Sequence, residues 1–476
     1  MEIKNFKKIN DWLWEIPQNF RGDMRVPARI YASEKMLGEI LRDRSIEQLI
    51  NVATMPGIYK YALAMPDAHE GYGFPVGGVS AMDVKEGLIS PGGIGYDINC
   101  GVRLLRSQLS FQDIKPKLEY LGQAIYKEVP SGVGRGGRLK LKNPELDRVL
   151  KSGAQELVKS GYGKPEDLLH LESGGALEGA DPSLVSDHAK NRGQDQLGTM
   201  GAGNHFVEVG RVDEIFDDEA AKALGLFKDQ VTVLIHTGSR GLGHQIATDY
   251  IRLMMKAMSK YGIKLPDREL AAAPFGSKEG QDYFKAMQCG ANFAWSNRQL
   301  ITWEVRKAWQ DVFGASGQEL DVVYDVAHNI AKLEEYDGKK LVIHRKGATR
   351  AFPKGNPELA EDYRQIGQPV LIPGSMGTAS YVLIGDEGSM KESFGSTCHG
   401  AGRRMSRTQA KKQVRGQELK QKLESEGIVI NAGSWSGLAE EAPLAYKDVE
   451  SVVDVVHSVG LAKKVARLKP VAVIKG

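Results

Sequence analysis

Glycine-rich polar loops follow short apolar segments along most of this chain. The 476 residues include 55 glycines, about 12% against a usual share of roughly 7%. Glycine suits tight turns and lets the backbone approach a ligand closely. The sequence therefore predicts many shaped loops, and loops at the ends of buried segments are where functional side chains often lie.

The apolar periodicity predicts helices and strands in an irregular order. Helical spacing covers residues 111–128, 143–160, 243–261, 279–313, 403–425 and 443–458. Strand-like runs cover residues 231–236, 320–326, 341–344, 370–373, 381–384 and 428–431. This order favours a mixed α+β fold over a regular βαβ repeat. Residues 213–315 contain fewer glycine-rich loops, which suggests a mainly helical insertion.

Composition and charge narrow the setting in which the protein works. The formal charge of +3 neither requires nor excludes nucleic acid, so a phosphate-binding surface must be local. Three cysteines in so long a chain are no disulfide framework and indicate a reduced compartment. The N-terminus lacks the apolar segment of a signal peptide, and no stretch is apolar over the roughly 20 residues that span a membrane. We expect a cytoplasmic monomer.

Five potential metal ligands each follow an apolar segment or a glycine turn. Asp97 and Cys100 lie three apart in GGIGYDINCGVR, and His205 follows the turn in GTMGAGNHFVEVG. His236 and His328 end or follow apolar strands. Singly, each is explained as well by a buried structural cysteine or a hydrogen-bonded histidine. Together, thiolate, imidazole and carboxylate donors suit zinc, manganese or iron, and a thiolate can bridge a pair of ions.

A separate segment, FGSTCHGAGRRMSR, carries a histidine between small residues. A free neutral imidazole such as that of His399 can attack phosphorus, and guanidinium groups stabilise developing phosphate charge. The arginines that follow are Arg403, Arg404 and Arg407. A basic helix start with a solvated face explains the same letters equally well. In MPDAHEGYGFPVGG, Asp67 and His69 are two apart and share one face of an extended strand.

Two further loops are basic, GVGRGGR at 132–138 and HRKGATR at 344–350. Either could grip phosphates, although most such runs are solvated loops. The first lacks the lysine and hydroxyl ending of a P-loop. Four other histidines have no comparable surroundings and receive no role: His170, His188, His244 and His457.

Taken together, these segments resemble the RtcB-type RNA-splicing ligases. The matching stretches are PDAHEGYGFPVGG, GGIGYDINCGVR, GAGNHFVEVG, HTGSRGLGH, DVAHN, HRKGATRA, PGSMGTASYVL, STCHGAGR, EAPLAYKDV and the terminal IKG. They span residues 66 to 476. By length alone roughly three domains would be expected. The resemblance instead implies one α+β domain over residues 1–476 that encloses a deep active-site cleft.

The resemblance also implies ligands for two Mn²⁺ ions. One ion would bind Asp97, Cys100 and His205, and the other Cys100, His236 and His328, so that Cys100 bridges. The implied contacts to GTP are Asn204, His205, Phe206, Val207, Glu208, His328, Asn329, Pro373, Gly374, Ser375, Met376, Ser380, His399, Gly400, Ala401, Gly402, Arg403, Tyr446 and Lys475.

The implied activity is GTP-dependent joining of RNA ends, in tRNA splicing and RNA repair. His399 would become guanylylated and pass GMP to an RNA 3′-phosphate, released where needed from a 2′,3′-cyclic phosphate. A 5′-hydroxyl end would then displace the GMP. Asp67 would orient the nucleophile or a metal-bound water, and archease is the implied protein partner. Our expected contacts to RNA phosphates are Arg240, Arg345, Lys346 and Arg350.

Two other functions remain open at this point. A dinuclear metallophosphoesterase would explain the metal ligands but would leave His399 without a role. A non-enzymatic RNA-binding protein would need no cysteine-centred donor set. The donor types alone do not separate manganese from zinc or cobalt.

Overall fold

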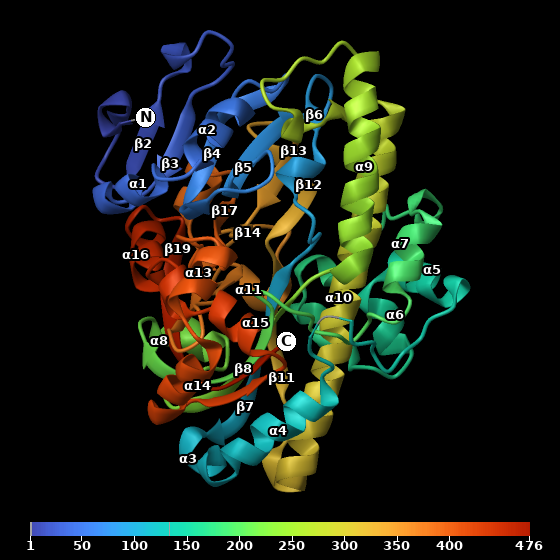
Figure 1. The fold of residues 1–476 in the computed structure, drawn as a ribbon, viewed down its shortest axis with the longest axis vertical. Coiled ribbons are helices and arrows are strands. Elements are labelled where there is room, and N and C mark those ends of the chain that lie inside the picture. Colours follow the sequence, from blue (N-terminus) through green and yellow to red (C-terminus); the bar gives the residue numbers. More distant parts are fainter. Residues whose placement is uncertain (1, 133) are drawn as a thin grey trace.

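Two large sheets form the centre of the molecule, which is known from a computed structural model that describes residues 2–132 and 134–476 (Figure 1). One sheet runs in the order β1 (Lys7–Lys8), β2 (Leu13–Ile16), β3 (Ala28–Tyr31), β4 (Ile58–His69), β5 (Val76–Asp83), β13 (Lys339–Lys346), β12 (Asn329–Tyr336). The other runs β11 (Asp321–Ala327), β7 (Gly101–Ser110), β9 (Gln230–Thr237), β8 (Phe206–Ile215), β19 (Ala462–Lys475), β16 (Ser380–Gly385), β15 (Pro369–Ile372), with β18 (Val429–Ala432) beside β19. This is the mixed α+β fold that the sequence predicted.

Two short ribbons and sixteen α-helices complete the described part of the chain. The ribbons pair β6 (Leu88–Ile89) with β10 (Ala273–Pro274), and β14 (Ala348–Arg350) with β17 (Ser396–Cys398). The helices are α1 (Glu34–Ile40), α2 (Ser45–Val52), α3 (Phe111–Ile114), α4 (Leu118–Glu128), α5 (Asn143–Ser152), α6 (Ala154–Lys159), α7 (Asp187–Gly193), α8 (Asp218–Ala223), α9 (Arg240–Lys260), α10 (Lys278–Phe313), α11 (Glu361–Arg364), α12 (Glu387–Glu392), α13 (Arg407–Gln413), α14 (Gly416–Ser425), α15 (Trp435–Glu440) and α16 (Val449–Ser458).

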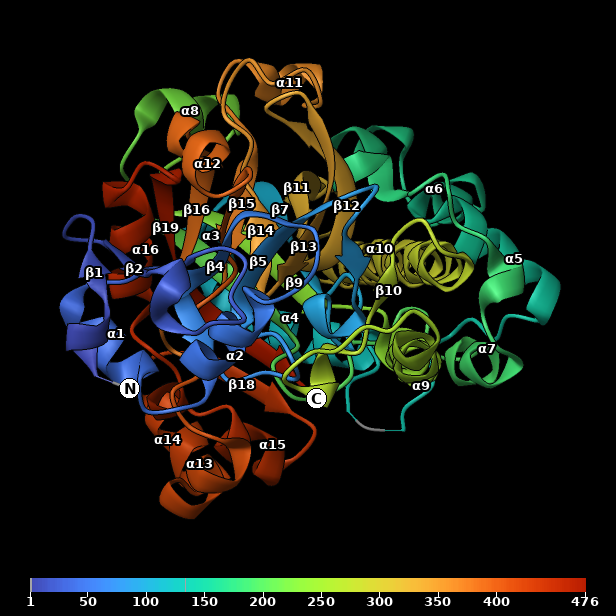
Figure 2. The same ribbon diagram turned by 90° about the horizontal axis from the view of Figure 1, so that it is seen from above.

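Helix α10 is the longest element, with 36 residues, and is buried along most of its length. A helix buried nearly all round belongs inside a protein rather than on its surface. It packs against α4, α5, α6 and α9, and Figures 1 and 2 show α9 and α10 running side by side between the sheets and the outer helices α5–α7. Several of its polar residues, among them Asn292, Asn297 and Arg298, are therefore buried in the core.

The antiparallel register gathers several strand ends at one edge of the larger sheet. Strands β7 and β8 begin there, while β9, β11 and β19 end there. The register joins the ends in successive pairs: Ala327–Gly101, Gly101–Thr237, His236–Phe206 and Phe206–Lys475. Residues distant in sequence are therefore neighbours at this edge, and the loops that precede or follow these strands meet there.

The ribbon of β14 and β17 brings another loop to the same edge. The N–H of Ala348 in β14 donates to the carbonyl of His328 at 3.1 Å. Ala348 pairs with Cys398 at the end of β17. His399, the next residue, is thereby placed beside the loop that follows β11.

The predicted helices and strands are found, with five differences. The helical pattern 111–128 is interrupted by a 3-10 turn at Lys115–Lys117. The helical pattern 143–160 is divided at Gly153, whose φ is +59°. The pattern 403–425 is divided between α13 and α14, and 443–458 opens with a 3-10 turn before α16. The segment 213–315 is mainly helical, as predicted, since it contains α8, α9 and α10. It is not a separate insertion, because β9 lies inside it and pairs with both β7 and β8. Among the described residues, no helix is long and apolar enough to span a membrane.

Candidate functional site

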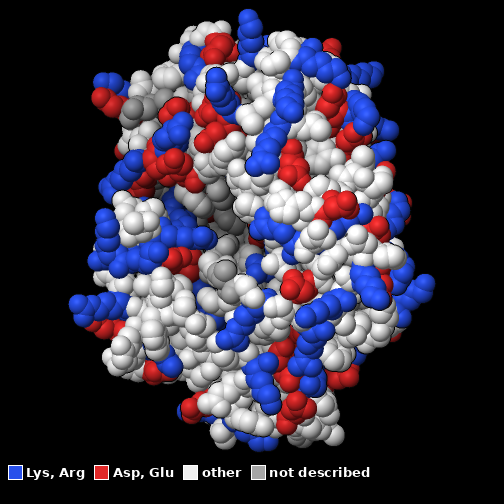
Figure 3. All heavy atoms as spheres, turned by 45° about the vertical axis from the view of Figure 1, so that its right-hand side comes forward, with Lys and Arg blue, Asp and Glu red and all other residues white. Residues whose placement is uncertain are grey.

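A cavity of about 300 Å³ opens at the shared edge of the larger sheet. Figure 3 shows one face of the molecule with a central hollow whose rim carries lysine and arginine side chains. The cavity wall includes most of the predicted nucleotide and metal contacts: Asp97, Cys100, Asn204, Phe206, Glu208, His236, His328, Asn329, Pro373, Gly374, Ser375, Met376, His399, Gly400, Ala401, Gly402, Arg403, Tyr446 and Lys475. The register of one sheet and the β14–β17 ribbon therefore bring these separate segments to one place.

The five predicted metal ligands form two groups that share Cys100. The first group is Cys100, His236 and His328, and the second is Asp97, Cys100 and His205, each with its ligand atoms within 4.8 Å of one another. The thiol Sγ lies 3.4 Å from Nε2 of His236 and 3.5 Å from Nε2 of His205. A single sulfur between two donor groups is the arrangement that a bridging thiolate needs.

Backbone contacts fix which nitrogen of His205 faces the metal donors. Its Nδ1 lies 3.0 Å from the carbonyl of Met200, so the hydrogen sits on Nδ1. Nε2 is then free to act as a ligand, and it lies 2.9 Å from Oδ2 of Asp97. The Nε2 atoms of His236 and His328 face each other at 3.4 Å. These donor types suit manganese, zinc or cobalt alike, so the residues fit a pair of such ions.

Burial sets the protonation of these ligands in the protein without an ion. Burial, reinforced by Asp97, raises the pKa of the Cys100 thiol well above its ordinary value. Burial and the neighbouring imidazoles lower the pKa of His236 and His328 well below the ordinary value. The two imidazoles are therefore neutral and ready to donate, whereas the thiol must lose a proton before it can bind a cation.

His399 stands between the metal donors and a buried carboxylate. Its ring lies 5.0 Å from that of His328, and its Nδ1 is 2.5 Å from Oδ2 of Asp67. The same Oδ2 accepts from the backbone N–H groups of His399 and Gly400, at 2.9 and 3.2 Å. Burial would raise the pKa of Asp67, but His399 and Lys447 outweigh it and lower that pKa. An ionised Asp67 thus fixes the imidazole and leaves Nε2 available.

A buried carboxylate, Glu208, lies in the cavity wall. Its one hydrogen-bond partner among the described side chains is Ser380, whose Oγ is 3.5 Å from Oε1. Burial raises the pKa of Glu208 to about 8. Lys475 is also buried there, and burial lowers its pKa to about 8. Lys475 donates from Nζ to the carbonyl of His205 at 3.3 Å, so both ends of this wall carry an ionisable group close to the metal donors.

Three predicted nucleotide contacts do not form part of the cavity wall. His205 belongs to the second group of metal donors. The hydroxyl of Ser380 donates to the carboxylate of Glu208. Val207 is fully buried in β8 between Phe206 and Glu208. Because successive side chains of a strand point to opposite faces, Val207 turns away when its two neighbours line the cavity.

Some residues in the cavity wall received no role from the sequence. His69 and Tyr96 lie beside Asp67 and Asp97 in the chain, and the ring of His69 stacks 6.4 Å from that of His399. Glu441 is buried, holds Arg403 at 3.1 Å and accepts from the hydroxyl of Tyr446. Glu441 falls within EAPLAYKDV, so a search of that stretch for acidic groups could have found it.

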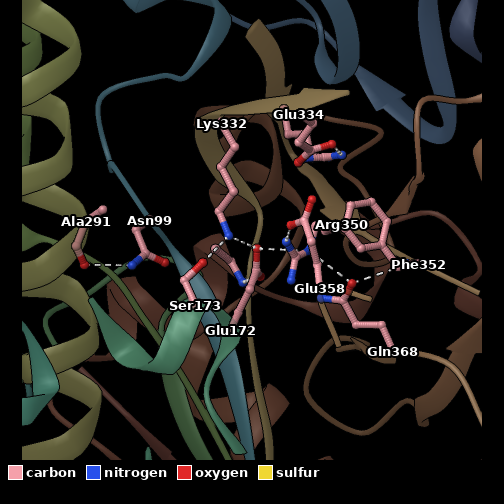
Figure 4. Close-up of polar contacts among 12 residues, drawn as sticks. Asn99, Glu172, Ser173, Ala291, Lys332, Glu334, Arg350, Phe352, Glu358 and Gln368 are labelled. Atoms are coloured by element: carbon pink, nitrogen blue, oxygen red, sulfur yellow. Dashed lines mark hydrogen bonds and ion pairs between the residues drawn. The ribbon is translucent and has the colours of Figure 1, made fainter. Parts of the chain in front are cut away.

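Two of the four expected RNA contacts are wrong, because their side chains are buried and already paired. Arg345 binds both carboxylate oxygens of Glu334, at 2.5 and 2.8 Å, with neither side chain more than 2% exposed. Arg350 lies between Glu172 and Glu358, next to Lys332 (Figure 4). The stretch HRKGATR forms the end of strand β13 and the whole of strand β14, rather than a solvated loop.

The other two expected RNA contacts lie nearer the cavity. Lys346 lines the cavity, donates to the carbonyls of Tyr72 and Phe74, and has its pKa lowered to about 7 by burial. Arg240 begins α9 and donates from Nε to Thr199 at 3.2 Å. Its charge acts on Asp97, so it lies beside the metal donors.

The chain resembles known proteins over its full length. The family model described as tRNA-splicing ligase RtcB matches residues 48–476. Proteins named tRNA-splicing ligase RtcB are 57% identical in Thermococcus kodakarensis over 481 residues (100% of both chains) and 56% identical in Archaeoglobus fulgidus over 476 residues (99% of this chain and 98% of that one). The one from Methanococcus maripaludis is 54% identical over 475 residues (98% and 99%).

These matches and the fold define an enzyme of the RNA ligase class. Identity this high over nearly the whole chain identifies the family as well as the class of enzyme. The chain belongs to the RtcB family of tRNA-splicing ligases, as the sequence motifs predicted.

We predict that metal affinity rises with pH by about tenfold per unit between roughly pH 6 and 8, because binding must release the Cys100 proton. The neutral His236 and His328 add no further proton release. Titration against a competing chelator at several pH values measures the slope. In Cys100→Ser the dependence should flatten and both ions should bind more weakly; an equally steep slope in that variant would rule out the thiol as its source.

We predict that Arg345→Met lowers the free energy of unfolding by about 3–5 kcal/mol, because Glu334 is left as an uncompensated buried charge. Urea denaturation measures this loss. Arg415→Met is the matched surface control; the Arg415 side chain is 85% exposed and pairs with Glu418, so the loss should stay below about 1 kcal/mol. Unchanged stability of Arg345→Met together with weaker RNA binding would restore Arg345 as an RNA contact.

Proposed function

We propose that this protein is a GTP- and Mn²⁺-dependent RNA ligase that acts in tRNA splicing and RNA repair. It would join an RNA 3′-phosphate or 2′,3′-cyclic phosphate end to a 5′-hydroxyl end through a guanylylated histidine. The observation that carries the proposal is His399, held by the Asp67 carboxylate beside the two donor groups that share Cys100. A metallophosphoesterase needs the donor groups but no such histidine.

The cavity offers a basis for selecting guanine. When ionised, the buried carboxylate of Glu208 has two oxygens that can accept from N1–H and the 2-amino group of guanine. Because burial raises its pKa to about 8, Glu208 would release a proton on binding, and the two guanine donors would favour that ionised form. Adenine has an acceptor at N1, which would leave the carboxylate unpaired at the cost of its desolvation. Tyr446 and Arg403, tied together through Glu441, also border the cavity and can pack against the nucleotide.

His399 would act as the nucleophile toward the α-phosphorus of GTP. Asp67 holds Nδ1–H and stabilises the positive charge that grows on the ring as Nε2 bonds to phosphorus. The bond from the α-phosphorus to the bridging oxygen breaks, and pyrophosphate leaves with the electron pair. Lys346, Arg403 and Lys475 face the cavity as cations that offset phosphate charge.

Two further displacements complete the ligation. A 3′-phosphate oxygen of the first RNA attacks the phosphorus of the histidine-bound GMP, and His399 departs as a neutral imidazole. A 2′,3′-cyclic phosphate is opened by water beforehand. The 5′-hydroxyl of the second RNA then attacks the activated 3′-phosphate, forms the phosphodiester bond and releases GMP.

The metal ions would be held by the side chains that geometry brings together. Asp97, Cys100 and His205 would bind one ion, and Cys100, His236 and His328 the other. When bound, two such ions polarise phosphate oxygens and orient the groups that attack and leave. Arg240, beside Asp97, remains our proposed contact to an RNA phosphate. A cytoplasmic monomer that works with archease is proposed on composition and family resemblance.

We predict that incubation with Mn²⁺ and α-labelled GTP transfers label to the denatured protein, and that His399→Ala abolishes the transfer. Label retention on a denaturing gel measures this step. His457→Ala is the matched control, since His457 is exposed on α16. Wild-type protein that binds Mn²⁺ but acquires no label would contradict the proposal and favour the metallophosphoesterase.

We predict that Glu208→Gln raises the GTP concentration for half-maximal labelling by roughly 10- to 100-fold, because hydrogen bonds to an ionised carboxylate are lost. The preference for GTP over ITP, which lacks the 2-amino group, should shrink in parallel. Glu304→Gln is the matched control, a buried carboxylate with a raised pKa on α10 away from the cavity. Equal effects of the two substitutions would show that Glu208 does not recognise the base.

A further inference from the structure

We propose that Arg298, in the middle of α10, is a positioning residue for the metal centre. Its guanidinium ties together the segments that carry three of the metal ligands, Cys100, His236 and His328. The inference rests on the two-ion site proposed above. It gives the longest buried helix a part in the chemistry, although that helix supplies no metal ligand itself.

All five N–H groups of Arg298 are used, and every acceptor lies next to the metal centre in sequence or supports it. Nη1 donates to the carbonyls of Asn99 and Thr237, both at 2.8 Å. Nη2 donates to Oδ1 of Asn99 at 3.1 Å and to Oδ1 of Asp325 at 2.8 Å. Nε donates to Oδ2 of Asp325 at 2.8 Å. One planar group therefore spans three separate segments of chain.

The three acceptor residues stand close to ligands along the backbone. Asn99 immediately precedes Cys100, and Thr237 immediately follows His236. Asp325 lies in β11, three residues before His328. Any shift of the guanidinium would therefore move these backbones relative to one another.

Asn99 binds the same helix a second time. Its Nδ2 donates to the carbonyl of Ala291 on α10 at 2.7 Å, as Figure 4 shows. Its backbone is left-handed, with φ at +51°, a conformation that asparagine tolerates better than most residues. The turn that presents Cys100 is thus fixed to α10 through both Arg298 and Ala291.

The residue after Cys100 leaves room for this arrangement. A Cβ atom on Gly101 would lie 3.0 Å from Cζ of Arg298 and 2.5 Å from the carbonyl oxygen of Val326. Glycine therefore lets the guanidinium lie directly against the backbone next to the bridging thiol. A larger side chain at position 101 would collide with the guanidinium and with the backbone of Val326.

The chemistry of the contact favours arginine over any other cation. The side chains of Arg298 and Asp325 are both 0% exposed, so water does not take over a missing bond. Lysine would keep the charge, but its single ammonium offers no planar fork that reaches three acceptor groups at once. Groups that orient metal ligands from behind typically change metal affinity by about 10- to 100-fold when they are replaced.

Arg103 provides a matched control for Arg298. It is equally buried and binds the same carboxylate, with Nε 2.8 Å from Oδ2 of Asp325. Its other bonds go to Gln299 and Thr302 on α10, at 2.7 and 3.0 Å. Arg103→Lys therefore disturbs the same buried ion pair without releasing the backbones of Asn99 and Thr237.

The test measures metal binding rather than ligation. Full-length wild type, Arg298→Lys and Arg103→Lys are loaded with Co²⁺, and affinity is obtained by chelator competition while the cobalt–thiolate charge-transfer band is recorded. Arg298→Lys should bind about 10- to 100-fold more weakly, with a shifted or weakened band. Arg103→Lys should lose thermal stability to a similar extent but keep the wild-type affinity and band. Asn99→Gly, which keeps the left-handed turn and removes one acceptor, should change in the same direction by less.

Two results would overturn the inference while leaving the proposed function intact. One is wild-type affinity and an unchanged band in both Arg298→Lys and Asn99→Gly. The other is an equal loss of metal affinity in Arg298→Lys and Arg103→Lys, which would show that Arg298 contributes only to the overall stability of the fold. Wild-type protein that binds no second ion, or that binds two equally well after Cys100→Ala, would instead overturn the bridged site itself and this inference with it.

Discussion

The antiparallel register of the larger sheet determines where everything else in the molecule can act. Strand ends from five positions along the chain meet at one edge because each strand pairs with its neighbour in the opposite direction. The ligand loops are short continuations of those strands, so sheet hydrogen bonds hold them in place. A one-residue slip of β9 would turn His236 to the other face of the sheet, and a slip of β7, β8 or β11 would displace the ligand in the adjoining loop. The donor geometry is therefore a consequence of strand pairing as much as of the ligands' own chemistry.

The second component of the site, the histidine beside its carboxylate, comes from a different sheet and a separate ribbon. Asp67 lies two residues before the end of β4 in the smaller sheet, while His399 follows the ribbon strand β17. Their contact joins the smaller sheet to the β14–β17 ribbon beside the cavity. The buried pair of Arg345 and Glu334 supports the same junction, since Arg345 also donates to the carbonyl of Phe394 and the hydroxyl of Ser396.

Much of the fold and most of the site could be predicted from the sequence, for identifiable reasons. Apolar runs located β9, β11 and β16 because buried strands need continuous hydrophobic residues. Donor chemistry selected Asp97, Cys100 and the three histidines, and the structure groups the same five. Their convergence could not be derived from spacing, because it depends on register between distant strands; the family motifs supplied it.

The errors have equally physical origins. HRKGATR looks like a basic loop, yet Glu334 in β12 neutralises Arg345 and Glu172 in a 3-10 helix neutralises Arg350 in the core. The pairing depends on how distant segments pack, which the residues around each arginine do not reveal. The segment 213–315 was interpreted as an insertion because it contains fewer glycine-rich loops, although one strand in it lies inside the larger sheet. Arg298 escaped notice for a similar reason, since a single arginine in a long helix carries no motif.

Because the ligands are scattered from Asp97 to His328 and the reactive histidine comes later still, no early part of the chain contains the site. Contacts between residues so far apart in sequence form late in folding, after the entropy of closing the intervening chain has been overcome. During synthesis, the ribosome must release β11 before the second donor group exists, and β17 before the histidine joins it. A partly made chain that lacks β11 therefore cannot complete the second donor group, and one that lacks β17 has no histidine beside the donors. The complete site forms only after β17 and the histidine that follows it have been synthesised.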